Sequence, residues 1–149
     1  MRVVEAPVRV RYAETDAQGV VYYANYFVWF EVGRITYLRT AGFDYAQMER
    51  DGFGFVIVEA YCRYLAPAHF NEELLVRTWI AEIKHRSFAF VYEVVNQATG
   101  QLLATGRTVQ VVIDRQGKPK EIPAALRQML TSFSEGADLG QEVATDRHG

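Results

Sequence analysis

The sequence predicts a single α+β domain in which one long helix packs against an antiparallel sheet. Apolar and aromatic residues recur at helical spacing from Tyr26 to Ala41, which indicates one long helix. Four later segments between residues 53 and 114 are rich in aromatic and β-branched residues, which is typical of β-strands. Because the connections between them are short, neighbouring strands are expected to run antiparallel. A chain of 149 residues can bury one substantial core.

The N-terminal part of the chain predicts a strand, a loop and the long helix. Residues 8–12 alternate valine or tyrosine with arginine, the pattern of a half-buried strand. A loop follows at Asp16–Gly19, and the helix then runs for about 18 residues to Gly42, whose position suits a helix C-cap. Few polar residues interrupt this helix, so we expect it to be buried on most sides.

The rest of the chain predicts a short helical turn at 44–51, four strands and a terminal helix. The strands are expected at Phe53–Tyr64, Leu74–Lys84, Ser87–Asn96 and Leu102–Asp114, and the helix at Pro123–Phe133. We therefore expect one domain over residues 1–133 and a flexible tail over residues 134–149, a segment that is polar and contains glycine. One helix cannot cover both faces of such a sheet, so exposed strand edges and leftover apolar surface favour an oligomer.

The composition argues against several classes of protein. The net charge of −2 and the pI near 5.9 disfavour a nucleic-acid partner, which usually requires a basic excess. Cys62 is the single cysteine, so no internal disulfide can form, and a reducing cytoplasm is the expected location. No run of about 18 apolar residues occurs, so we expect no integral membrane contact. His69 and His148 have no partners at ligand spacing, which argues against a metal site.

The segment from Arg11 to Phe27 carries the strongest functional signal. It places Asp16 in a loop of small residues, directly before the aromatic start of the long helix. The first backbone N–H groups of a helix have no partner within the helix, so they bind anions and can stabilise an oxyanion. Asp16 would supply a nucleophile or a general base, and the helix end would supply electrophilic help. Acyl transfer is the chemistry that uses both.

These residues resemble the hotdog-fold acyl-CoA thioesterases of the 4-hydroxybenzoyl-CoA thioesterase family, including its Tol–Pal-linked branch. The resemblance runs from about Val8 to Ile122, and the segment from Asp16 to Tyr22 is its most specific part. The matching residues are Arg11, Tyr12, Thr15, Asp16, Gly19, Val20, Val21, Tyr22, Asn25, Tyr26, Glu31, Arg34, Tyr64, Leu65, Pro67, Ala68, Arg86, Ser87 and Phe90.

The resemblance implies a hotdog fold, in which a curved antiparallel sheet wraps around a long central helix and subunits pair edge to edge. It implies hydrolysis of a thioester between coenzyme A and a small or aromatic acid, with no cofactor, in a homodimer that assembles into a homotetramer. Asp16 stands where the family has its catalytic carboxylate. The backbone N–H of Tyr23 stands where the family has its oxyanion donor. Family members carry either histidine or an aromatic residue where Tyr23 stands, which leaves the acyl group open.

Other residues near the motif are candidates for substrate binding. The missing Cβ of Gly19 would let a substrate carbonyl approach the backbone, and Asn25 would bind substrate or cap the helix. The remaining candidates for the pocket wall are Tyr12, Val20, Val21 and Tyr22. A basic cluster with a neighbouring hydroxyl is the candidate for the phosphates of coenzyme A and consists of Lys84, His85, Arg86 and Ser87.

Two carboxylates are alternatives to Asp16. Glu31 lies on the helix and is expected to pair with Arg34, because an unpaired buried charge is costly. Glu59 lies on a predicted strand and suits a structural role. Two other functions also fit the pattern: a thioesterase for acyl carrier protein, and a module that binds acyl-CoA without hydrolysing it. The sequence does not decide whether Asp16 attacks the carbonyl or activates water.

Overall fold

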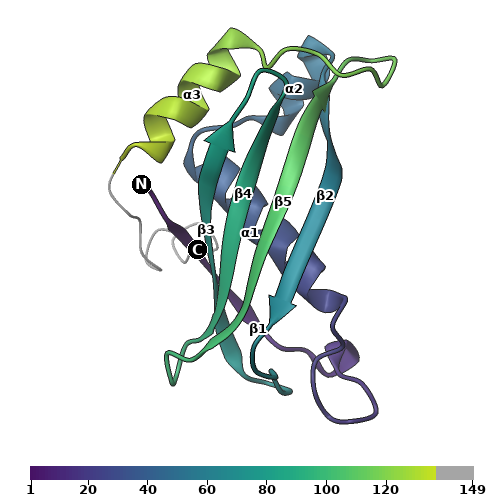
Figure 1. Cartoon of the computed structure of the whole chain (residues 1–149), viewed down its shortest axis with the longest axis vertical. Coiled ribbons are helices and arrows are strands. Elements are labelled where there is room, and N and C mark those ends of the chain that lie inside the picture. The colour runs from purple at the N-terminus through teal and green to yellow at the C-terminus, as the bar shows by residue number, and fades with distance from the viewer. Residues whose placement is uncertain (137–149) are drawn as a thin grey trace.

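The computed structural model describes residues 1–136 and shows a five-stranded sheet with a long helix across one face (Figure 1). The tail is predicted over residues 134–149; Ser134 instead ends the last described helix, and residues 137–149 lie outside the described residues. The strands are β1 (Val4–Arg9), β2 (Gly54–Tyr64), β3 (Glu73–Ile83), β4 (Ser87–Asn96) and β5 (Leu102–Ile113). The helices are a 3₁₀ turn η1 (Tyr12–Glu14), α1 (Asn25–Thr40), α2 (Tyr45–Asp51) and α3 (Ala124–Ser134).

The sheet has the strand order β1-β3-β4-β5-β2, and every neighbouring pair is antiparallel. β1 and β2 are therefore the two edge strands. Short hairpins join β3 to β4 and β4 to β5, as their close spacing in the sequence predicts. The α+β hotdog architecture expected from the sequence is confirmed, with α1 lying in the curve of the sheet (Figure 1).

Close contact between α1 and the sheet depends on glycine. A Cβ on Gly33 of α1 would clash with Thr78 and Val76 of β3, and a Cβ on Gly106 of β5 would clash with the ring of Phe30. Because both Cβ atoms are missing, α1 lies close enough for Phe30 to stack on Tyr92, with ring centroids 4.4 Å apart and planes 12° apart.

The helix is buried on one side and exposed on the other. Trp29, Phe30 and Tyr37 face the sheet and are at most 1% exposed, whereas Val28 and Val32 are 51% and 37% exposed. The expectation of burial on most sides is therefore wrong for a single chain. One sheet covers one face of a helix, and within the described residues nothing covers the opposite face of α1.

The ends of the helices follow their local sequence. Gly42 has φ of 97°, and its N–H donates to the carbonyl of Arg39, which confirms the predicted termination of α1. Asp44 caps α2 by accepting hydrogen bonds from the N–H groups of Ala46 and Gln47. None of the described helices is long and apolar enough to span a lipid bilayer.

The first strand differs from its prediction. β1 begins at Val4 and ends at Arg9, whereas the alternation of residues 8–12 predicted a strand reaching Tyr12. The chain turns instead because Glu14 N–H donates to the carbonyl of Arg11 and Thr15 N–H donates to the carbonyl of Tyr12. This turn takes Tyr12 out of the sheet, and the residue is 77% exposed.

We predict that Gly106→Ala will lower the free energy of unfolding by about 1–3 kcal/mol, because the added methyl group forces Phe30 out of its place. Chemical denaturation followed by circular dichroism will measure the change. Gly54→Ala is the matched control, since a Cβ there meets Ile113 at an ordinary 3.9 Å. Equal stability of both variants would contradict the close approach of α1.

Candidate active site

The Asp16 loop is a tight turn closed by backbone hydrogen bonds. Asp16 N–H donates to the carbonyl of Val20 at 2.8 Å, and Gly19 N–H donates to the carbonyl of Asp16 at 3.0 Å. Gly19 has φ of 81°, a conformation that favours glycine. The N–H of Val21 donates to the carbonyl of Ala68 at 2.9 Å, so the segment after β2 holds the loop in place.

The carboxylate of Asp16 is half-buried and keeps one oxygen available. Oδ1 accepts a hydrogen bond from the N–H of Gln18 at 2.8 Å, which fixes the rotation of the side chain. Within the described residues, Oδ2 accepts no hydrogen bond. A carboxylate held by one oxygen can present the other to a substrate or to water.

The start of α1 supplies free backbone donors beside this loop. The N–H groups of Asn25, Tyr26 and Phe27 donate three residues back, to the carbonyls of Tyr22, Tyr23 and Ala24. These bonds extend α1 by one 3₁₀ turn, so its effective N-terminus lies at Tyr23 rather than at Asn25. The N–H groups of Tyr23 and Ala24 bond to no acceptor among residues 1–136. Free amides at the positive end of a helix dipole favour an anion.

Asp16 and Tyr23 line one groove of about 410 Å³. Its walls are Asp16, Val20, Val21, Tyr23, Tyr26, Tyr64, Leu65, Ala66 and Pro67. Three of these residues are tyrosines in contact: the ring of Tyr64 lies 5.0 Å from that of Tyr26 and 6.2 Å from that of Tyr23. Burial raises the pKa of Tyr26 to about 12, so its hydroxyl is neutral at physiological pH. The groove is therefore largely apolar with one carboxylate.

Tyr64 connects β2 to the start of α1. Its hydroxyl donates a hydrogen bond to the carbonyl of Tyr23 at 2.8 Å. Partial burial and the neighbouring Cys62 raise the pKa of Tyr64, so the hydroxyl keeps its proton and remains a donor. The bond orients the peptide between Tyr23 and Ala24, and with it the free N–H of Ala24.

Several predicted site residues lie outside the walls of the groove. Tyr12 lies on η1 against Phe70, with ring centroids 5.7 Å apart, and is not among the residues that line this groove in the single chain. Asn25 does not cap α1, because its Nδ2 donates to the carbonyl of Glu14 instead. Gly19 shapes the turn, and Tyr22 is exposed against Tyr23. Val20 and Val21 line the groove as expected.

Sequence reasoning missed part of the site. Tyr26 and Tyr64 form much of its wall, and Glu14 binds the loop to α1 through its buried carboxylate. The match at Tyr64 and Leu65 was a usable signal, but only the pairing of distant segments shows that these residues face Asp16.

The basic cluster lies at the opposite end of the sheet from the Asp16 loop. Ser87 pairs with Val111, and Val111 pairs with Val56, near the beginning of β2. Tyr64 is eight residues further along β2, a separation of ~26 Å at ~3.3 Å per residue. Figure 1 shows the turn between β3 and β4, which contains Lys84 and Arg86, at the opposite end of the sheet from the loop before α1. Within one chain, therefore, these residues and Ser87 do not meet Asp16.

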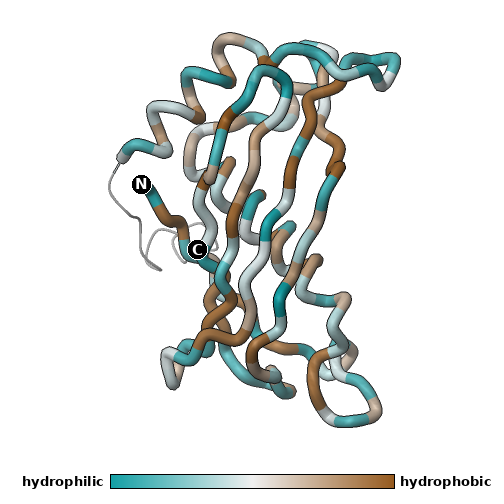
Figure 2. Tube along the Cα trace, viewed as in Figure 1, coloured by the Kyte–Doolittle hydropathy of each residue, from teal (hydrophilic) through white to brown (hydrophobic). Residues whose placement is uncertain are grey.

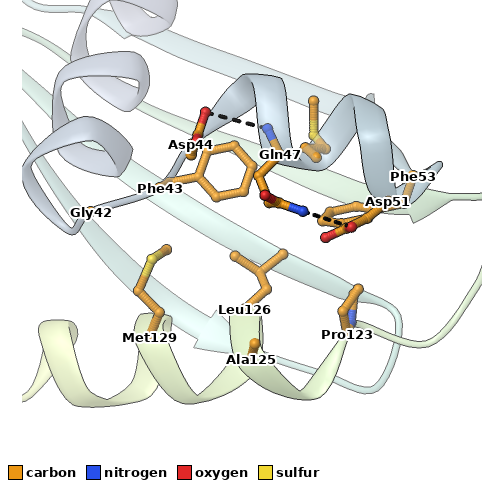
Figure 3. Close-up of a pocket in the computed structure, with 11 residues that line it drawn as sticks. Gly42, Phe43, Asp44, Gln47, Asp51, Phe53, Pro123, Ala125, Leu126 and Met129 are labelled. Atoms are coloured by element: carbon orange, nitrogen blue, oxygen red, sulfur yellow. Dashed lines mark hydrogen bonds between the residues drawn. The ribbon is translucent and has the colours of Figure 1, made fainter.

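A second cavity, of about 220 Å³, lies between α2 and α3 (Figure 3). Met129 and Leu126 of α3 point toward Phe43, which lies between α1 and α2. Two carboxylates lie beside it: Asp44 caps α2, and Oδ1 of Asp51 accepts a hydrogen bond from Gln47 at 2.8 Å. We place the candidate site in the Asp16 groove instead, because its wall contains Asp16, Val20 and Val21 of the segment that carries the strongest functional signal in the sequence.

Comparison with known proteins agrees with this architecture. Residues 10–130 match the model of the thioesterase-like superfamily. The acyl-CoA thioesterase YbgC of Haemophilus influenzae is 34% identical over 130 residues, which covers 83% of this chain and 93% of that protein.

Two solved structures share the fold. The DHNA-CoA thioesterase from Staphylococcus aureus is 29% identical, with a TM-score of 0.82 over 94% of this chain and all of that one. A 4-hydroxybenzoyl-CoA thioesterase mutant complexed with 4-hydroxybenzoyl-CoA has a TM-score of 0.81 over 87% of this chain and 99% of that one, and its 22% identity supports the fold alone. This chain therefore belongs to the thioesterase-like superfamily and has the hotdog fold of its thioester hydrolases.

Proposed function

We propose that this protein is an acyl-CoA thioesterase. The observation that carries the proposal is that Asp16, with one unbound carboxylate oxygen, and Tyr23, at the start of α1, line the same apolar groove. Within the described residues, the backbone N–H groups of Tyr23 and of the next residue, Ala24, bond to no acceptor. A thioester needs both features, because its carbonyl carbon must be attacked while negative charge collects on its oxygen. The names of related proteins, such as YbgC of Haemophilus influenzae, support the same substrate class.

In the proposed reaction, the thioester carbonyl oxygen accepts hydrogen bonds from the amides of Tyr23 and Ala24. Asp16 then attacks the carbonyl carbon, or takes a proton from a water molecule that attacks instead. In the first route an acyl–aspartyl anhydride forms as the C–S bond breaks, and water then hydrolyses the anhydride. Both routes consume one water molecule and release a carboxylic acid and coenzyme A. The protein's own groups supply every role, so the proposed reaction uses no cofactor.

The proposed acyl group is small or aromatic. The rings of Tyr23, Tyr26 and Tyr64 supply flat apolar walls, and Tyr26 and Tyr64 keep neutral hydroxyls. Flat rings in contact suit a planar aromatic acid, which gains edge or stacking contacts with them. A panel of aromatic, short aliphatic and long aliphatic acyl-CoAs will rank these classes.

We further propose that the active site is completed in a homodimer that pairs through β2. Figure 2 shows hydrophobic residues in the first half of this edge strand, and Val56, Ile57 and Val58 are 39%, 42% and 54% exposed. α1 also carries two exposed valines, Val28 and Val32. Long apolar edges of this kind are normally covered.

Antiparallel pairing of two β2 strands would bring opposite ends of the subunits together. The beginning of one β2 would lie beside the end of the other, because a two-fold axis reverses the strand direction. Arg86 and Ser87 lie near the beginning of β2, and Tyr64 marks its end beside the Asp16 groove. The basic cluster of one subunit would thus reach the groove of the other, where it can bind the phosphates of coenzyme A.

A homotetramer is the proposed larger assembly. The face of the sheet opposite α1 carries Trp79 and Val91, which lie directly opposite each other on β3 and β4 and are half-buried. None of the described helices covers this face. Two dimers could bury it by packing sheet against sheet.

We expect Asp16→Asn to fold normally and to lose at least ~100-fold in kcat, because the amide is neither a base nor a nucleophile. Release of free thiol from an acyl-CoA measures turnover. Glu49→Gln is the control, since this exposed carboxylate of α2 lies away from the Asp16 groove. Wild-type turnover by Asp16→Asn would remove Asp16 from the mechanism.

Tyr64→Phe is expected to reduce kcat by about 5- to 20-fold, because the peptide after Tyr23 loses a hydrogen bond that orients it. The ring stays, so the melting temperature should change little. Tyr61→Phe, which removes a hydroxyl from an exposed tyrosine of the same strand, provides the comparison. If both variants are equally active, the bond to Tyr23 has no catalytic importance.

Mixing two inactive variants will test the shared site. Asp16→Asn and Arg86→Ala subunits, unfolded and refolded together in equal amounts, should regain about a quarter of wild-type activity, because each mixed dimer contains one intact site. Each variant refolded alone is the control. Failure to regain activity, with mixed dimers demonstrated by mass spectrometry, would place both residues in one subunit's site or outside it.

A further inference from the structure

We propose that Glu14 is a positioning residue, which fixes the Asp16 carboxylate relative to the amides of Tyr23 and Ala24. The inference rests on the proposed function and adds a residue that does not touch the substrate. Glu14 is 4% exposed, lies two residues before Asp16 and is not part of the groove wall.

The Glu14 carboxylate joins the turn before Asp16 to the body of α1. Oε1 accepts a hydrogen bond from the N–H of Arg11 at 2.7 Å, and Oε2 accepts one from Nε1 of Trp29 at 3.1 Å. The guanidinium of Arg11 lies 3.5 Å from Oε2 and compensates part of the charge. Trp29 belongs to α1, is 1% exposed and packs in the core, so its indole N–H holds the carboxylate rigidly.

The backbone of the same residue joins the loop to the start of α1. The carbonyl of Glu14 accepts hydrogen bonds from the N–H of Tyr22 at 2.8 Å and from Nδ2 of Asn25 at 2.9 Å. Tyr22 directly precedes the free N–H of Tyr23, and Asn25 directly follows that of Ala24. Both sides of the proposed oxyanion site are therefore held to one residue of the Asp16 segment.

The buried carboxylate of Glu14 is better explained by a role in positioning the Asp16 segment than by a contribution to the stability of the fold. A buried charge is costly unless several groups bind it, and an apolar side chain would fill the same space at less cost. What the charge adds is direction, because hydrogen bonds to Arg11 and Trp29 fix it in one orientation. Catalysis is sensitive to such placement, since a displacement of about 1 Å can reduce a rate ~100-fold.

Glu14→Gln is the direct test. It keeps the size of the side chain but replaces one acceptor oxygen with a donor, so the Arg11 and Trp29 bonds cannot both persist. Measured well below the melting temperature and per folded molecule, kcat for an acyl-CoA should fall by about 10- to 100-fold, with KM within about twofold of wild type.

Two controls separate positioning from loss of stability. Leu130→Ala and Ile122→Val destabilise the fold from buried sites on and before α3, away from the loop, and should keep wild-type kcat per folded molecule. If Glu14→Gln is too unstable to study, Glu14→Asp takes its place, because it keeps the charge and withdraws it from Trp29. It should show the same fall in kcat, with KM unchanged.

The outcomes distinguish this inference from the proposed function. Loss of turnover in Asp16→Asn together with wild-type kcat in the Glu14 variant would overturn the inference alone. Wild-type turnover in Asp16→Asn would instead overturn the proposed function. A Glu14 variant whose KM rises while kcat stays constant would assign Glu14 to substrate binding and would also reject a positioning role.

Discussion

The contact between α1 and the curved sheet determines where the candidate site forms. Gly33 and Gly106 remove the two Cβ atoms that would hold the helix away, and the stacked rings of Phe30 and Tyr92 occupy the space between the layers. With the axis of α1 fixed in this way, its N-terminus emerges beside the end of β2, where the segment after that strand holds the Asp16 loop. Asp16 and Tyr23, the first residue of the helix end, line one groove there because the packing of the core leaves α1 little freedom.

The two ends of the sheet differ in their electrostatic character. The end that contains Asp16 offers an apolar groove, one available carboxylate oxygen and the positive end of a helix dipole. The other end offers the basic side chains of Lys84 and Arg86. A thioester of coenzyme A has the matching asymmetry, with an apolar acyl group at one end and phosphates at the other. The proposed β2 pairing explains how both ends of the substrate could be bound by one assembly.

Sequence patterns located most elements to within two residues, because each depends on local chemistry. Gly42 ends α1, Asp44 begins α2, and the alternation of β4 predicts its buried face. The exception is the region around Tyr12. Its alternation is that of a strand, but the hydrogen bonds of the Arg11–Glu14 turn replace further pairing with β3. An alternating pattern does not reveal this competition, because the Glu14 carboxylate has one nearby partner, Arg11, and one partner 15 residues further along the chain, Trp29 of α1.

The sequence by itself determined the fold class, and it predicted the carboxylate and the helix end of the candidate site, since these depend on spacing and on side-chain chemistry. Tertiary structure alone decided which residues complete the site. Tyr64 reaches Tyr23 across 41 positions, and the turn with Arg86 lies at the other end of the sheet from the loop before α1, although Tyr64 and Arg86 belong to the same resemblance. The physical reason is that strand order and register, not position along the chain, set which side chains converge.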